Sequence, residues 1–396
     1  MSLITGVGFS NHRNPADAGR EAAQQAMAKA GIDQPDFVFL FGTVGYNQRI
    51  LLQTVREVTG GAPLSGCSGE GLIVNGAVYE FDLGVVVSVV KSDEIRLSNA
   101  HAVGMSTDAM RLGQTLGDAL ALGDATDALM LIAFADGLTL DFDAMLRGLM
   151  HKCPSQHAIP LVGGTTSDER SFSAATYQYC DDDVLSDGAV ATLIRGKGEV
   201  FTGTGHGCVK VGDELTVTKA DANRILEIDH RPALKVIDEF LTVEERDKDW
   251  TKTNVFLAVG IKASASMKRG DDDYLIRFMP MRDEEAVWVS TEISEGTRFF
   301  MTRRDQDKIA HGNQRLTEEI QKGLAGRNPR FMLQIECIGR GKVFFEDSKK
   351  QRFLRDMQAA VSKDANWFGL YTHGEFGPAG GINRFHNYSL VLAAIA

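Results

Sequence analysis

Close to its C-terminal end, the chain carries a base and an acid on either side of a glycine, directly after an apolar run. His373, Gly374 and Glu375 follow "WFGLYT" in this order. A carboxylate that folding removes from water needs a cationic or hydrogen-bonding partner. For Glu375 this partner could be the amine of a small ligand, or it could be Arg340, which ends another strand-like run, "RFMLQIECIGR".

Arg340 leaves two alternatives open in turn. Its planar guanidinium can hold a carboxylate through two parallel hydrogen bonds. If that carboxylate belongs to a ligand, Arg340 and Glu375 together would suit the two charged ends of an amino acid. If it belongs to Glu375, the two residues form a plain structural salt bridge.

Cys67 suggests a different chemistry, because it follows a short strand-like run and opens the glycine-rich turn "GCSGEG". A thiol in such a place can act as a nucleophile when a base activates it, and His373 is the candidate base for a hydrolase or transferase. No base stands at a fixed spacing from Cys67. We therefore interpret Cys67 as a structural or ligand-lining cysteine and expect no catalysis.

Cofactor motifs do not select another function. The segments "GVGFS" and "GTVGYN" lack the GxGxxG pattern, and the chain has no Walker sequence, so nothing indicates nucleotide binding. His206, His230 and His373 are candidate haem ligands, but no CxxCH and no helical ligand pair singles one out. We expect no cofactor and no metal, with haem as the alternative.

The elements that must position these residues alternate between strands and helices, which predicts an α/β fold. Residues 2–9 are typical of a strand. The segment "NPADAGREAAQQAMAKAGI" predicts a helix that Asn14 caps, Pro15 begins and Gly31 ends. Further helices are expected around residues 47–59, 142–151 and 346–361.

The first half of the chain contains the same pattern twice. "DFVFLFGTVG" is followed by a helix, "APLSGCSGEGL" and "FDLGVVVSVVK"; later "DALMLIAFADG" is followed by a helix, "IPLVGGTTSDE" and "SDGAVATLIRG". Gly163 matches Gly66 in this comparison. The ordered set predicts an internal duplication, in which residues 37–90 and 128–194 form equivalent strand–helix–strand units.

The C-terminal end repeats the pattern more distantly, as "RFMLQIECIGR", a helix, "WFGLYTHGEF" and "FHNYSLVLAAI". Ligands of open α/β sheets settle beyond the carboxyl ends of strands, where glycines let backbone N–H groups approach. The comparison of the three copies places three turns at equivalent positions, Cys67–Glu70, Gly164–Thr166 and Thr372–Glu375. We therefore expect Ser68, Thr165 and Gly374 to lie near one another around one pocket between the N-terminal and C-terminal parts of the chain, unless the glycines only serve tight turns. The candidate ligand-binding residues are Cys67, Ser68, Glu70, Thr165, Thr166, Arg340, His373, Gly374 and Glu375.

The composition limits the partners. The 396 residues carry 42 Lys and Arg against 53 Asp and Glu, a net charge of −11, which argues against nucleic acid or an anionic membrane as partner. "MSLITGVGF" does not resemble a signal peptide, and the apolar run "VVVSVV" at residues 85–90 is too short to span a bilayer. Five scattered cysteines suit reduced thiols, so we expect a cytoplasmic protein.

Several of these segments resemble landmarks of the FIST domain family, over nearly the whole chain. "PDFVFLFGT" and "LLQTVREVTGGAPLSGCSGEG" resemble the N-terminal part, and "LTVTKADANRILEIDHRPALKVIDEFL" resembles the joint between the two parts. "ISEGTRFFMTRRD", "ECIGR" and "FGLYTHGEFGP" resemble the C-terminal part. One departure is Asp229-His230, where the family pattern has Asp-Gly.

The resemblance implies a sensory protein that binds a small ligand, with amino acids as the usual suggestion. Because the resemblance fills the chain, such a sensor would signal through a separate partner, for example a histidine kinase. The family also includes haem-binding, nitric-oxide-sensing members. We expect mixed sheets with helices, with two related repeats in an N-terminal part (1–222) and a more distant third copy in a C-terminal part (223–396).

Overall fold

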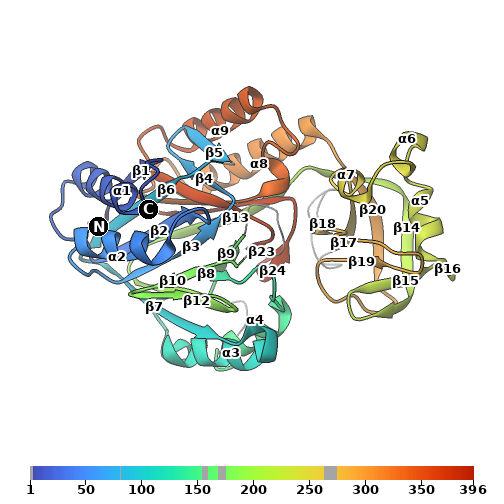
Figure 1. Ribbon diagram of the computed structural model, residues 1–396, viewed down its shortest axis with the longest axis horizontal. Coiled ribbons are helices and arrows are strands. Elements are labelled where there is room, and N and C mark those ends of the chain that lie inside the picture. The colour runs from blue at the N-terminus through green and yellow to red at the C-terminus, as the bar shows by residue number, and fades with distance from the viewer. Residues whose placement is uncertain (1–2, 81, 154–158, 168–174, 263–273) are drawn as a thin grey trace. The chain divides into compact units, whose positions relative to one another are not determined.

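The computed structural model describes residues 3–80, 82–153, 159–167, 175–262 and 274–396 (Figure 1). The protein is mixed α/β, as expected, and its chain divides into two compact units. Unit 1 comprises Met1–Thr204, Arg315–Arg384 and Leu390–Ala396, and unit 2 comprises Gly205–Gln314 and Phe385–Ser389. Both units take residues from either side of position 222, so a division of the chain there stays a prediction about the family halves.

Unit 1 is built on three six-stranded sheets that share one strand order. The first is β1-β6-β2-β3-β10-β11, with bounds Leu3–Ser10, Val85–Ser92, Phe37–Thr43, Leu64–Gly69, Gln178–Cys180 and Asp183–Leu185. The second is β7-β12-β8-β9-β23-β24, with bounds Ile95–Val103, Gly188–Gly196, Ala128–Ala135, Leu161–Thr165, Glu375–Ala379 and Ile382–His386. The third is β13-β25-β21-β22-β4-β5, with bounds Val200–His206, Ser389–Ile395, Phe331–Cys337, Trp367–Thr372, Gly71–Val74 and Ala77–Glu80.

Each sheet contains the predicted strand–helix–strand unit. The pairs β2–β3, β8–β9 and β21–β22 are parallel, and β6, β12 and β25 each pair antiparallel with the first strand of the unit. The equivalence of residues 37–90 and 128–194 is therefore confirmed in strand order, and a third copy follows. In that copy residues 207–305, which belong to unit 2, separate β13 from α8 (Gln306–Leu324), the next helix of unit 1.

Within each repeat, a strand hairpin follows the parallel strand pair. This hairpin joins the sheet of another repeat. The hairpin β4–β5 of the first repeat pairs with β22 of the third, β10 of the second pairs with β3 of the first, and β23 of the third pairs with β9 of the second. The three exchanges run in one direction and close a ring. Each repeat thereby completes the sheet of a different repeat.

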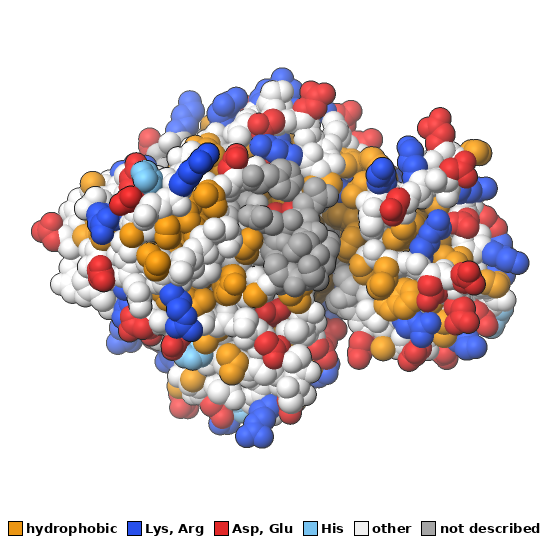
Figure 2. Space-filling model, viewed as in Figure 1, with side chains coloured by type: hydrophobic (Ala, Val, Ile, Leu, Met, Phe, Trp, Pro, Cys, Tyr) orange, Lys and Arg blue, Asp and Glu red, His pale blue; other side chains and the backbone are white. Residues whose placement is uncertain are grey.

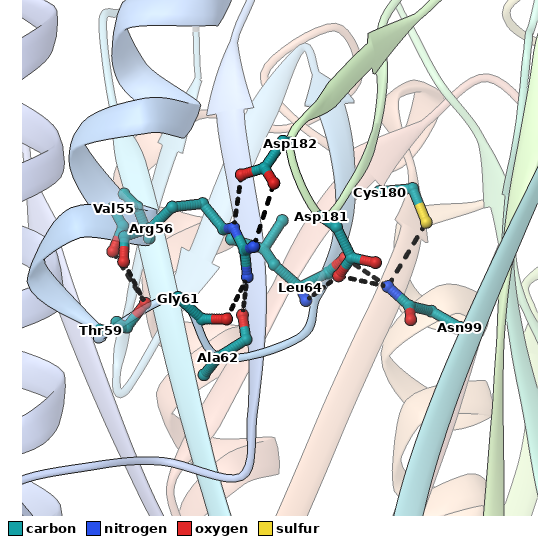
Figure 3. Close-up of polar contacts among 10 residues, drawn as sticks. All are labelled: Val55, Arg56, Thr59, Gly61, Ala62, Leu64, Asn99, Cys180, Asp181 and Asp182. Atoms are coloured by element: carbon teal, nitrogen blue, oxygen red, sulfur yellow. Dashed lines mark hydrogen bonds and ion pairs between the residues drawn. The ribbon is translucent and has the colours of Figure 1, made fainter.

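Side chains anchor these exchanged hairpins, as Figure 3 shows for β10–β11. Arg56 Nε lies 2.9 Å from Asp182 Oδ1 at the tip of the hairpin. Asp181 Oδ1 accepts the backbone N–H of Leu64 at 3.0 Å and the Asn99 side-chain amide at 3.1 Å. The turn between β10 and β11 is thus held by residues of α2 (Gln48–Val58), β3 and β7.

Helices cover the outer faces of the sheets, whereas the inner faces meet in a common core. Phe41, Phe134 and Phe368 come from the three different sheets, and the ring of Phe41 lies 5.2 Å from that of Phe134 and 5.9 Å from that of Phe368. The helices of unit 1 are α1 (Pro15–Ala30), α2 (Gln48–Val58), α3 (Met105–Ala119), α4 (Phe142–Leu149), α8 (Gln306–Leu324), which begins in unit 2, and α9 (Asp347–Val361), with short 3-10 turns at Leu122–Asp124 and Ile338–Arg340.

The caps of α1 are those that the sequence predicts. The Asn14 side chain accepts hydrogen bonds from the N–H groups of Ala16 and Asp17, and Gly31 ends the helix with φ of 65°. Its alanine-rich face lies directly on β1, because Gly6 and Gly8 have no side chain to hold the helix away. Local sequence is sufficient to define this element.

Unit 2 has its own sheet and its own apolar core. The sheet order is β16-β15-β14-β20-β17-β18, with β19 pairing β15, and the bounds are Arg231–Pro232, Arg224–Ile228, Cys208–Asp221, Arg298–Arg304, Leu257–Lys262, Tyr274–Arg277 and Val287–Trp288. Short helices α5 (Ala233–Asp238), α6 (Val243–Arg246) and α7 (Trp250–Thr253) follow β16. Phe299, Met301 and Trp250 contribute to the core.

The altered turn at Asp229-His230 leads to a first prediction. Both residues are left-handed, with φ of 49° and 61°, between β15 and β16. A side chain is unfavourable there, and the His230 N–H bond to Thr218 Oγ1 does not need the imidazole. We expect His230→Gly to stabilise unit 2 by about 0.5–1 kcal/mol in urea unfolding. A loss of stability would show that the imidazole makes a favourable contact.

Candidate functional site

Three glycines set the register of the parallel strand pairs in the three repeats. A Cβ atom added to Gly66, Gly163 or Gly369 would lie 1.8, 1.9 or 1.8 Å from a carbonyl oxygen of the neighbouring parallel strand. The three oxygens belong to Leu40, Ala133 and Gln334. These positions are therefore equivalent, and the residues four places later in each repeat are Glu70, Ser167 and His373.

Among these three equivalent residues, Glu70 contacts both of the others. Glu70 Oε2 lies 2.9 Å from His373 Nε2, and the Glu70 backbone N–H donates to Ser167 Oγ at 2.9 Å. Glu70 and Ser167 are fully buried, whereas 12% of the His373 side chain is exposed. The ends of the three equivalent strands β3, β9 and β22 thus converge on one point.

The predicted proximity of the turns is confirmed. Thr165 Oγ1 accepts the N–H groups of His373 and Gly374 at 3.1 and 3.0 Å, and the Thr165 N–H donates to the Gly374 oxygen at 2.8 Å. Ser68 Oγ donates to the Ser167 oxygen at 3.3 Å. We call residues 68–70, 165–167 and 372–375 the three-turn site; that it binds a ligand stays a prediction.

Two further predicted residues lie in or beside the same turns. Glu375 is fully buried and accepts a hydrogen bond from Thr372 Oγ1 at 3.0 Å. Thr166 Oγ1 accepts the side-chain amide of Gln178 at 2.9 Å, and Gln178 lies on the exchanged hairpin. The buried polar groups of the turns are therefore organised by side chains of all three repeats.

The sequence comparison missed Ser167. It matched Thr372–Glu375 with Cys67–Glu70, but the glycine register equates Cys67 with Leu370, which shifts the third turn by two residues. When Gly66, Gly163 and Gly369 are aligned instead, Ser167 occupies the position that is equivalent to Glu70 and His373. The signal was present in these three glycines, each of which is the third residue of its strand.

Cys67 lies on β3 within the common apolar core rather than among the hydrogen-bonding groups of the turns. Burial raises the pKa of its thiol well above the ordinary value. A neutral, enclosed thiol is a poor nucleophile. This placement favours the structural interpretation of Cys67.

Arg340 is fully buried at the end of β21, and its ion pair is with Glu336. Arg340 Nε lies 3.0 Å and Lys350 Nζ 2.5 Å from Glu336 Oε1. Burial opposes ionisation of Glu336, but Lys350 and Arg340 outweigh it and lower its pKa. Arg340 thus forms a buried salt bridge with Glu336, a residue that the sequence analysis did not consider. A contact of Arg340 with Glu375 or with a ligand stays a prediction.

On the face that Figure 2 shows, basic and acidic side chains are intermixed, as expected for a solvated surface.

The other two candidate haem ligands lie outside the three-turn site. His230 lies in the β15–β16 turn, and the His206 ring accepts the Cys208 N–H at 3.2 Å. In the described part of the chain, no group of three His, Cys, Asp or Glu side chains could hold a metal ion. Nor is any helix there long and apolar enough to cross a membrane.

Comparison with known proteins gives weakly similar relatives. An uncharacterized protein of Mycobacterium bovis is 26% identical over 406 aligned residues, covering 98% of this chain and 97% of the relative. One of Mycobacterium tuberculosis is 24% identical over 397 residues, with 98% of each chain covered. One of Methanocaldococcus jannaschii is 25% identical over 246 residues, covering 58% of this chain and 47% of the relative.

Two solved structures align along the whole chain at low similarity. A cyanuric acid hydrolase from A. caulinodans gives a TM-score of 0.38 at 9% identity, covering 100% of this chain and 99% of the other. A chorismatase gives 0.37 at 7% identity, again covering 100% and 99%. Such scores carry no argument about this chain.

The family models show which family the chain belongs to, whereas the single relatives share too little sequence identity to show it. The FIST N domain matches residues 36–231, and the FIST C domain matches residues 233–378. Together they cover most of the chain, including all three turns of the site. The chain belongs to the FIST domain family.

Proposed function

We propose that this FIST protein is a sensor that binds an amino acid or a similar small metabolite at the three-turn site and signals through a separate partner, such as a histidine kinase. The observation that carries the proposal is the convergence of Glu70, Ser167 and His373 from three equivalent strand ends. Three repeats place hydroxyl, carboxylate, imidazole and backbone groups at one point. A fold that needed only tight turns has no requirement for this set.

The chemistry of the site suits a zwitterion. Glu70 and Glu375 are buried carboxylates that can hold an ammonium group, and charge-assisted hydrogen bonds of this kind are strong. Hydroxyl groups of Ser68, Thr165 and Ser167 can adapt as donors or acceptors. His373, the partly exposed member, lies where a ligand would meet the site first.

A thermal-shift screen of the full chain tests the proposal. A ligand that binds only the native state raises its stability, by about 2.7 kcal/mol at a concentration of roughly one hundred times Kd. We expect at least one amino acid or related carboxylate-bearing amine to raise the melting temperature. If none of them does so at millimolar concentration, the proposed ligand class is wrong.

Glu375→Gln tests the site at the level of one residue. The amide keeps the shape of the side chain and can still accept the Thr372 hydroxyl, so the fold should remain nearly intact. Loss of the charge should weaken binding of an ammonium-bearing ligand by about 1.5–3 kcal/mol, measured by calorimetric titration. A large fall in melting temperature with unchanged affinity would instead make Glu375 a structural residue.

A further inference from the structure

A second buried acid lies close along the chain to the three-turn site, on the hairpin that begins directly after Glu70. Glu80 on β5 is 1% exposed and pairs across the hairpin with Gly71. Its Oε2 accepts the backbone N–H of Lys342 at 2.8 Å. The carboxylate lies so close to the loop after β21 that a Cβ on Gly341 would meet it at 2.0 Å.

The other oxygen of Glu80 is poorly satisfied. Tyr371, also fully buried, has its hydroxyl beside the Glu80 carboxylate, yet neither that hydroxyl nor Glu80 Oε1 makes a hydrogen bond of good geometry to a described residue. A buried oxygen in this situation favours the protonated carboxyl group, which needs less compensation than an anion. The groups that face Glu80 are Glu336 on β21, Arg340 after it, Lys342 with its partner Asp347, Lys350 on α9 and Tyr371 on β22.

The hairpin is attached to α9 by an apolar cluster, in which Val78 lies with Leu354 and Met357, and by side-chain hydrogen bonds to the hairpin backbone. Gln358 Oε1 accepts the Gly76 N–H at 2.7 Å, and Gln351 both accepts from and donates to the backbone of Val78, at 3.2 and 2.7 Å. Glu80 adds the anchor at the end of β5. Opening the hairpin from α9 would hydrate Glu80 and move the strand that follows Glu70.

We propose that Glu80 makes the β4–β5 hairpin a pH-sensitive latch, closed on α9 when Glu80 carries a proton and loosened when it does not. This latch also tunes the ligand affinity of the three-turn site, because β4 begins directly after Glu70. This second inference rests on the proposed function. The device is built into the ring of exchanged hairpins. In the described part of the chain, Glu80 is the only acid on β4–β5.

The direction of the pH effect follows from burial. Burial raises the pKa of Glu80 from 4.5 to about 7 in the closed state, although the Lys342 N–H and Lys350 oppose it. In an open hairpin the pKa of Glu80 returns to its ordinary value, because the carboxyl group is hydrated again. The closed state is therefore favoured fully below pH 4.5, and this advantage is lost as the pH rises through 7. The opening equilibrium should increase roughly twentyfold between pH 5.5 and 7.5.

Amide hydrogen exchange of the full chain tests the latch without any ligand. After correction for intrinsic rates, exchange at Gly76 and Val78 should rise about twentyfold from pH 5.5 to 7.5 in the wild type. In Glu80→Gln it should remain at the low-pH level. The β10–β11 hairpin, anchored through Tyr179 and Gln48, is the internal control and should not change.

Equal pH dependence in wild type and Glu80→Gln would overturn the proposal, and so would parallel changes in both hairpins, which indicate global unfolding. If Glu80→Gln does not fold, the carboxyl 13C signal of Glu80 in the wild type decides, with an expected midpoint near pH 7. A midpoint below pH 5.5 would contradict the latch. A ligand from the screen should bind more weakly at pH 7.5 than at pH 5.5; if no ligand is found, only the sensor proposal fails.

Discussion

Gly369→Ala should destabilise unit 1 by more than about 4 kcal/mol, a large share of the stability of an ordinary domain. Its Cβ would lie 1.8 Å from the Gln334 carbonyl oxygen, a backbone atom fixed in the strand pair β21–β22. No rotamer change can relieve this contact. Gly66→Ala and Gly163→Ala should behave alike, because each meets the equivalent oxygen.

Gly326→Ala is the matched control for this prediction. Gly326 lies before β21 rather than within a strand, with φ of 81° and no heavy atom within 4 Å of an added Cβ. It should lose only about 1–2 kcal/mol, the usual penalty of a left-handed alanine. Urea unfolding of the four variants decides, and a Gly369→Ala loss no larger than that of Gly326→Ala would contradict the common register.

Glu336→Gln should cost about 3–5 kcal/mol, because it leaves two buried cations without their shared anion. Arg340 and Lys350 both contact Glu336 Oε1, and all three side chains are at least 96% buried. Urea unfolding at neutral pH measures the loss. The amide has one acceptor oxygen where the carboxylate has two, so it cannot serve Gln334 together with both cations, and the loss includes this hydrogen bonding as well as the charge.

The double variant Glu336→Gln/Lys350→Met provides the control. Removing one of the stranded cations together with the anion should recover part of the loss, because coupled residues in one buried cluster are not additive. A double variant as unstable as the sum of the two single variants would show that the ion pairs contribute nothing to the fold. A loss below about 1 kcal/mol for Glu336→Gln would lead to the same conclusion.

Local elements could be predicted from the sequence because their signals are local. Asn14, Pro15 and Gly31 define α1 on their own, and the repeated proline–leucine–x–glycine strands disclose the first two repeats. The third copy looks distant because residues 207–305 interrupt it between β13 and α8. The insertion separates elements that the other two repeats keep adjacent.

The exchange of hairpins could not be predicted in this way. β4 pairs with β22, almost three hundred residues later, and nothing in the periodicity of either strand specifies a partner so far along the chain. Glu336, which lies four residues before Arg340 and pairs with it, was also overlooked in the sequence. The convergence of Ser68, Thr165 and Gly374 was accessible because strand ends of equivalent repeats carry equivalent positions.

The binding of a small ligand at the three-turn site is tested most directly by the imidazole signals of the histidines. We would record the ring 15N resonances of the full chain with and without a millimolar mixture of the twenty amino acids. We predict that the His373 signals shift, because its ring contacts Glu70 at the convergence of the turns, while the signals of the exposed His101 on β7 do not change. Unchanged His373 signals, with or without shifts at His206 and His230 of unit 2, would contradict ligand binding at the three-turn site.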